Sequence, residues 1–137
     1  MKIDPSAFVA DQELIQALEK RSTPIDCAED RILFRQGESP AGLYILHEGT
    51  VTLTMESPLG EAVMEGSAAA GSLLGLPGLI GNEPYSLTAR ALKGAGGSFV
   101  KRDDFSNLML TEPAMSVRVL RVLAAEVRTA RFALSEL

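Results

Sequence analysis

The spacing of apolar residues divides the chain into a helical start, a β-rich middle and a helical end. Over residues 5–20, apolar side chains recur at intervals of three and four, at Phe8, Leu14, Ile15 and Leu18. This period predicts an amphipathic packing helix within an N-terminal segment of residues 1–22. The helical segment ends at Thr23, because a residue that precedes a proline avoids helical backbone angles.

The middle of the chain, residues 25–100, consists of short apolar runs that are separated by turns. Strand-like runs occupy residues 31–34, 43–46, 51–55, 62–64, 86–92 and 97–100. The run at 51–55 alternates apolar residues with threonine, a period of two that is typical of a half-buried strand. Short strands at this spacing predict a β-sandwich or barrel.

The C-terminal segment, residues 101–137, returns to a helical pattern. A short helix is expected over residues 103–110, with acidic residues in its first turn, and Pro113 starts a longer one. The apolar stripe of the longer helix includes Val119, Leu123, Val127, Ala130 and Leu134. Because this stripe outruns the surface that a small barrel covers, it predicts a homodimerisation helix. The alternative is a helix that folds back on its own barrel.

Composition excludes several classes of function. A chain of 137 residues fits one domain, and its net charge of −5 argues against direct binding of nucleic acid. Cys27 is the only cysteine and His47 the only histidine, so one chain assembles no disulfide, iron–sulfur cluster or zinc site. We expect no metal and no catalytic site. We interpret His47 as a surface or turn histidine, since no acid partner is evident from the sequence.

The least charged part of the chain, residues 66–82, is too interrupted to cross a membrane. Gly71, Gly75, Pro77 and Gly78 break it. No apolar signal-peptide core follows the N-terminal methionine. A cytoplasmic protein without membrane association is therefore expected.

Several short motifs occur in a recognisable order. They are residues 34–38, residues 43–46 with Gly49, residues 71–76, residues 84–89 and residues 101–105. In this order they resemble the cyclic-nucleotide-binding domain of the Crp/Fnr transcription regulators. The resemblance covers nearly the whole chain, as a single sensor domain of residues 1–137. It implies a mainly β fold with flanking helices: a jelly-roll-like β-roll, or double-stranded β-helix, and a long C-terminal dimerisation helix.

The resemblance also implies a phosphate-binding cassette at residues 71–90, and here its charged residues are replaced. Nucleotide-binding members carry a glutamate directly after the cassette glycine and an arginine directly before a serine or threonine. In this chain Leu76 follows Gly75, and Tyr85 precedes Ser86. An arginine fork neutralises the cyclic phosphate, and its loss costs a few kcal/mol, or about a hundredfold in affinity. We therefore do not expect a cyclic nucleotide as a cofactor, and any small ligand should be less anionic than a cyclic nucleotide.

Nearby residues do not restore the missing charges. Arg90 lies five residues beyond Tyr85, which places it on the opposite face of a strand, as a surface arginine. Glu83 sits in the loop rather than after the cassette glycine. On the long helix, Ala130 and Arg131 occupy the region of the family's base-contacting residue, with Thr129 one step away. Leucines and Ile80 of the cassette either fill the barrel, leaving no cavity, or surround an altered apolar pocket.

Two functions follow from the resemblance. The first is a sensor domain of a Crp/Fnr-type regulator, in which a ligand shifts the long helix. In such regulators a helix-turn-helix domain follows, and the sequence to residue 137 contains none. DNA would therefore be contacted only through an absent C-terminal domain. The second is a stand-alone degenerate domain that dimerises or binds a partner protein without a small-molecule ligand.

Overall fold

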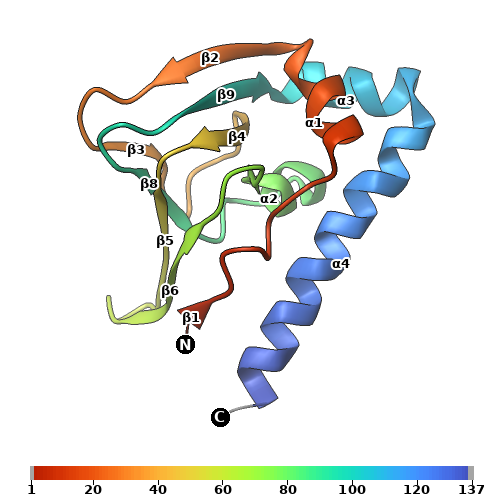
Figure 1. The fold of residues 1–137 in the computed structure, drawn as a ribbon. Helices are drawn as coiled ribbons and strands as arrows, with labels where there is room; N and C mark the ends of the chain where they lie inside the picture. The colour runs from red at the N-terminus through yellow and green to blue at the C-terminus, as the bar shows by residue number, and fades with distance from the viewer. Residues whose placement is uncertain (1, 136–137) are drawn as a thin grey trace.

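The computed structural model describes the backbone of residues 2–135 and the side chains of residues 2–127. The described chain forms two β-sheets with helices on one side (Figure 1). One sheet has the order β1-β6-β5-β8-β3 and the other β2-β9-β4-β7. The strands are β1 (Lys2–Ile3), β2 (Ser22–Asp26), β3 (Arg31–Phe34), β4 (Gly42–Glu48), β5 (Val51–Glu56), β6 (Ala62–Ala68), β7 (Leu73–Leu74), β8 (Thr88–Ala91) and β9 (Gly96–Lys101). The mainly β fold with flanking helices is confirmed.

Four helices accompany these strands in the described part of the chain. They are α1 (Gln12–Glu19), α2 (Leu76–Gly81), α3 (Arg102–Thr111) and α4 (Pro113–Ser135). In Figure 1, α4 runs along one side of the strands, with α1 and α3 near its N-terminal end. No helix among residues 2–135 combines the length and hydropathy that crossing a membrane requires.

The core has two parts, which strand β4 separates. Leu43 and Ile45 face the helices, where they join buried residues of α1, α3 and α4. Leu46 faces the interior between the two sheets, together with Val51 and Leu53 of β5. Since successive side chains of a strand point to opposite faces, one strand supplies both cores. The sheets and the helices are thereby held as a single unit.

The N-terminal helix is shorter than the sequence predicts. It begins only after Asp11, whose carboxylate accepts a hydrogen bond from the Leu14 N–H at 3.0 Å. Before it, the backbone pairs with the cassette: Val9 bridges Ser72, and the Leu73 N–H donates to the Phe8 carbonyl at 2.8 Å. These long-range bonds replace the helical ones that the apolar spacing predicted, so tertiary pairing overrides the local pattern.

A further strand, β2, was not expected from the sequence. It contains Thr23 and Pro24, and it pairs with β9 alone at the edge of its sheet. A proline removes one backbone donor, which an edge strand tolerates because one side of its ladder has no partner. The proline that suggested a break therefore lies within a strand.

The long helix α4 both folds back on the barrel and keeps an exposed apolar face. Val119 and Val122 are buried in the helix-side core, and Leu123 packs partly against it. These contacts correct the predicted dimerisation stripe, because Val119 is already covered by its own chain. The exposed α4 face consists of Val117, Leu120 and the predicted Val127. The predicted Ala130 and Leu134 have side chains outside the described residues.

A leucine pair on α3 provides a test of the helix-side core. Leu108 is 0% exposed and Leu110 is 81% exposed. We expect Leu108→Ala to lower the free energy of unfolding by about 2–5 kcal/mol, because it leaves a cavity that its neighbours fill only in part. The matched Leu110→Ala variant should change it by less than about 0.5 kcal/mol. Urea denaturation followed by circular dichroism measures both, and equal losses would contradict this core assignment.

Candidate functional site

The cassette begins with a sharp turn from β7 into α2. Gly75 stands at this turn with φ of 93°, a left-handed backbone that glycine adopts without strain. A Cβ added to Gly75 would also lie 2.9 Å from a ring carbon of Tyr85. The turn therefore requires glycine for both its backbone angle and its close approach to Tyr85. Gly75 lies in the wall of a cavity.

Leu76 does not line this cavity. Its side chain is buried in the helix-side core, along with Leu79 of the same short helix. The sequence interpretation placed Leu76 among the pocket residues, and this placement is wrong for the described structure. The first turn of α2 directs this side chain toward the core around Phe105 and Leu108 instead. Leu76 thus anchors the cassette to the helix-side core rather than lining the cavity.

Tyr85 is buried, and the backbone occupies its hydroxyl. The hydroxyl donates a hydrogen bond to the Gly42 carbonyl at 2.7 Å and accepts one from the Gly42 N–H at 3.4 Å. Its ring stacks on that of Phe34, with centroids 4.1 Å apart and planes inclined by 19°. Burial raises the pKa of the Tyr85 phenol, so it stays neutral. Tyr85 therefore offers its ring, rather than its hydroxyl, to the cavity.

Backbone pairing holds Tyr85 in this position. The Gly37 N–H donates to the Tyr85 carbonyl at 2.8 Å, and the Tyr85 N–H donates to the Glu38 carbonyl at 2.9 Å. The turn after β3 is thereby tied to the end of the cassette loop. Ser86 follows at the surface, and it lines the same cavity. Tyr85 and Ser86 are thus brought together with Gly75, as the motif predicts.

The cassette cavity has a volume of about 60 Å³. Its walls are aromatic and aliphatic, from Phe8, Phe34, Leu53, Leu74, Tyr85 and Leu87. Sites that enclose drug-sized ligands measure roughly 300–1,000 Å³. The cavity is therefore much smaller than a nucleotide needs. Its polar exceptions are Ser86 at the mouth and Glu126 from α4.

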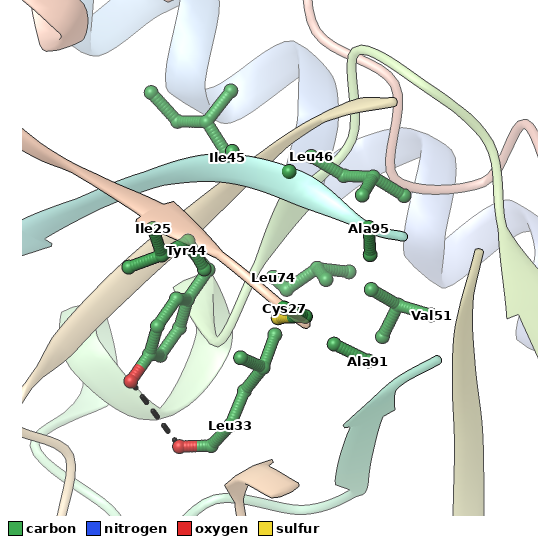
Figure 2. Close-up of a pocket in the computed structure, with 12 residues that line it drawn as sticks. Ile25, Cys27, Leu33, Tyr44, Ile45, Leu46, Val51, Leu74, Ala91 and Ala95 are labelled. Atoms are coloured by element: carbon green, nitrogen blue, oxygen red, sulfur yellow. Dashed lines mark hydrogen bonds between the residues drawn. The ribbon is translucent and has the colours of Figure 1, made fainter. Parts of the chain in front are cut away.

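A second, inner cavity lies between the sheets and measures about 10 Å³ (Figure 2). Cys27, Val51, Leu74 and Ala91 point into it, and Tyr44 at its edge donates a hydrogen bond to the Leu33 carbonyl at 3.2 Å. A space of this size holds at most about one water, and an apolar one stays dry. The sheet interior is therefore filled, while the cassette keeps a small opening. Of the cassette's apolar residues, Ile80 is exposed and fills neither cavity.

Glu126 lines the cassette cavity, and the sequence interpretation did not identify it. Its Oε1 atom is buried and has no hydrogen-bond partner among the described residues. Burial raises the pKa of the Glu126 carboxyl from its ordinary value of 4.5 to about 8. The spacing of two helical turns from Val119 was the available signal, since it places Glu126 on the buried stripe of α4. The predicted positions 129–131 have side chains outside the described residues.

The other ionic candidates lie away from the cavity. Arg90 pairs with Asp30 at 3.2 Å on the surface, as expected, and Glu83 is exposed in its loop. His47 does have an acid partner, Glu19, contrary to the sequence interpretation.

The contacts of His47 do not form a catalytic relay. Ser98 Oγ lies 3.1 Å from His47 Nε2, and Glu19 contacts the same nitrogen. A catalytic triad needs its acid and its nucleophile on opposite nitrogens of the ring. In the described part of the chain, no three residues of the metal-binding types come together either.

Comparison with known proteins places this domain in a family. Residues 24–112 match the family model for the cyclic nucleotide-binding domain. This span contains the whole cassette of residues 71–90. The chain belongs to the cyclic nucleotide-binding domain family. The catabolite activator protein of Thermus thermophilus has the same fold, with a TM-score of 0.78 at 20% identity over 96% of this chain and 62% of that one. The jelly-roll-like β-roll is thereby confirmed.

The curated relatives of this domain are Crp/Fnr-type transcription regulators. The transcriptional activator protein Anr of Pseudomonas protegens is 26% identical over 123 residues, covering 90% of this chain and 49% of the relative. The CRP-like cAMP-activated global transcriptional regulator of Mycobacterium tuberculosis is 25% identical over 135 residues, covering 98% and 57%. The chain thus spans about half the length of the curated relatives it matches.

The raised pKa of Glu126 predicts a pH-dependent stability. Between about pH 5 and pH 8 the folded carboxyl keeps a proton that the unfolded chain has lost, so stability falls as the pH rises. The total loss should be of the order of a few kcal/mol. Glu126→Gln should remove most of this slope, whereas Glu83→Gln, at an exposed site, should leave it unchanged. Urea titrations across this range test it, and a wild-type slope that Glu126→Gln preserves would contradict the assignment.

Proposed function

We propose that this chain is the effector-sensing domain of a Crp/Fnr-type regulator, and that it does not bind cyclic nucleotides in the usual way. The observation that carries the proposal is the chemistry of the cassette cavity. Tyr85 stands where nucleotide-binding members carry an arginine, and Gly42 occupies its hydroxyl. A cyclic phosphate entering here would meet aromatic rings and the Glu126 carboxyl, and no positive charge among the described lining residues. Burying an anion without a partner is strongly unfavourable.

Helix α4 supports a sensing role for the cavity. It supplies Glu126 to the cavity wall, while Val119 and Val122 of the same helix lie in the core. A ligand that contacts Glu126 would therefore favour one position of α4 over another, which is the requirement for allosteric coupling. In the regulators, DNA binding would belong to a separate part of the protein, in keeping with the net charge of −5 here.

In this proposal the domain is a cytoplasmic homodimer without enzymatic activity. The exposed α4 face carries apolar side chains at Val117, Leu120 and Val127, which repeat at intervals of three and seven. Such a face on a long helix favours a helix partner, and a second copy provides an identical one. The His47 contacts lack the geometry of a nucleophilic relay, which argues against catalysis.

A second candidate is a degenerate interaction domain that binds no small molecule. The filled sheet interior favours it, because the inner cavity measures only about 10 Å³ and Leu76 lies in the core. The two candidates share the homodimer and differ in whether the cassette cavity takes a ligand. Native mass spectrometry of the purified chain separates them when a ligand copurifies with the protein.

Cyclic nucleotide titration tests the altered cassette. Isothermal titration calorimetry of the chain with cyclic AMP and cyclic GMP should show no binding at micromolar concentrations, since the charge-assisted bonds to phosphate are absent. A catabolite activator protein of known cyclic AMP affinity serves as the positive control. Micromolar binding of either nucleotide would contradict the proposal.

The homodimer is tested on the exposed α4 face. Leu120 is 61% exposed, and Leu120→Glu places like charges opposite each other across a symmetric helix pair. We expect a dimer for the wild type and a shift of at least about tenfold toward monomer for this variant. Leu110→Glu, at an exposed leucine of α3, should remain dimeric. Sedimentation equilibrium measures both, and a monomeric wild type would contradict the dimer.

A further inference from the structure

The cassette cavity is lined by a carboxyl group that has one oxygen without a hydrogen-bond partner among the described residues. Glu126 Oε1 is buried beside the cavity and makes no hydrogen bond to the described residues. A carboxyl in this position either keeps a proton or acquires a cation, because an isolated buried carboxylate is costly. The structure therefore contains an unsatisfied acceptor next to an open space. Such a pairing indicates a ligand that carries positive charge.

Aromatic rings line the same space. Phe8, Phe34 and Tyr85 all contribute to its wall, and the last two form a stacked pair. The face of an aromatic ring attracts an organic cation, most strongly where water is excluded. The bonds between Tyr85 and Gly42 hold one ring of this set in a fixed orientation. A carboxyl and several aromatic rings that line one small space are a combination suited to alkylammonium groups.

The size of the cavity limits the ligand. A water molecule needs roughly 15 Å³ of such space, so a cavity of about 60 Å³ holds only a few non-hydrogen atoms. A compact alkylammonium head fits this volume, whereas a nucleotide does not. We propose that the cassette cavity binds a small alkylammonium cation, held by the Glu126 carboxylate and the rings of Phe8, Phe34 and Tyr85. This inference rests on the proposed function, in which the cavity is the effector site, and it names the class of effector.

Protons compete with such a cation for Glu126. The other titratable residue of the described cavity wall is Tyr85, which stays neutral. Strand β1 and helices α1 and α3 also pack against α4. The Lys2 side chain of β1 is exposed to solvent, Glu13 of α1 pairs with Arg118, and Glu112 after α3 pairs with Arg21. On α4 itself, the positions three and four residues earlier are the apolar Leu123 and Val122. Cation binding should therefore displace the Glu126 proton, and the affinity should rise with pH up to about 8.

The test compares two probes of nearly the same size and shape that differ in charge. Isothermal titration calorimetry of the full chain uses tert-butylammonium chloride and tert-butanol. At about pH 8 we expect the cation to bind at least about tenfold more tightly than the alcohol, because only the cation pairs with the carboxylate. At about pH 6 the cation should bind more weakly, with heats that depend on the buffer because a proton is released.

Two variants separate the cation site from non-specific binding. Glu126→Gln keeps the size of the side chain and should weaken the cation at least about tenfold while leaving the alcohol unchanged. Phe8→Leu removes one ring at similar volume and should weaken the cation more than the alcohol. Glu83→Gln, at an exposed position of the same cassette, is the matched control and should bind as the wild type does. Circular dichroism verifies that each variant is folded.

The outcomes distinguish this inference from the proposed function. Equal binding of both probes, no binding of the cation, or cation binding that survives Glu126→Gln would overturn the cation site. The sensor proposal would stand in each of these cases if cyclic AMP also failed to bind. Micromolar binding of cyclic AMP by the same sample would instead overturn the proposed function.

Discussion

The packing of α4 against the helix-side core is the contact on which the site depends. Val119 and Val122 enter that core and so fix the rotation of the helix about its axis. Because a helix repeats every 3.6 residues, the same rotation places Glu126 on the buried stripe, beside the cassette. It also turns Val117, Leu120 and Val127 outward. The packing of α4 therefore both places Glu126 in the cavity wall and leaves the apolar α4 face exposed.

The cassette shows how a pocket changes its chemistry while its fold is kept. An arginine at the position of Tyr85 would carry charge into the cavity, whereas the phenol uses the Gly42 backbone and brings only its ring. In the wall of the same cavity, Glu126 supplies a carboxyl that burial keeps protonated near neutral pH. The described walls have thus become apolar and acidic. In the proposed function, a cyclic phosphate therefore gains no partner from these described walls.

The sequence left open whether the interior is filled or contains an apolar pocket, and the two cavities show that each alternative describes part of the molecule. Between the sheets, close packing leaves a cavity of only about 10 Å³. So small a void is typical of a protein interior. At the cassette, the turn at Gly75 keeps the backbone close to Tyr85, and a space of about 60 Å³ remains beneath α4. In the proposed function, an opening of this size suits an effector of few atoms.

The sequence by itself determined most strands of the β-roll but not the edge strand β2, together with the two C-terminal helices and the replacement of charge at Tyr85. These follow from local periods, turn glycines and motif order, which act over a few residues. Only the tertiary structure decided that residues 5–11 pair with the cassette rather than extend α1, and that Leu76 lies in the core. Likewise, the apolar spacing of α4 could not show which residues the barrel covers. Hydrogen bonding across the chain, and the lack of a partner for Glu126 Oε1 among the described residues, depend on contacts between segments distant in the sequence.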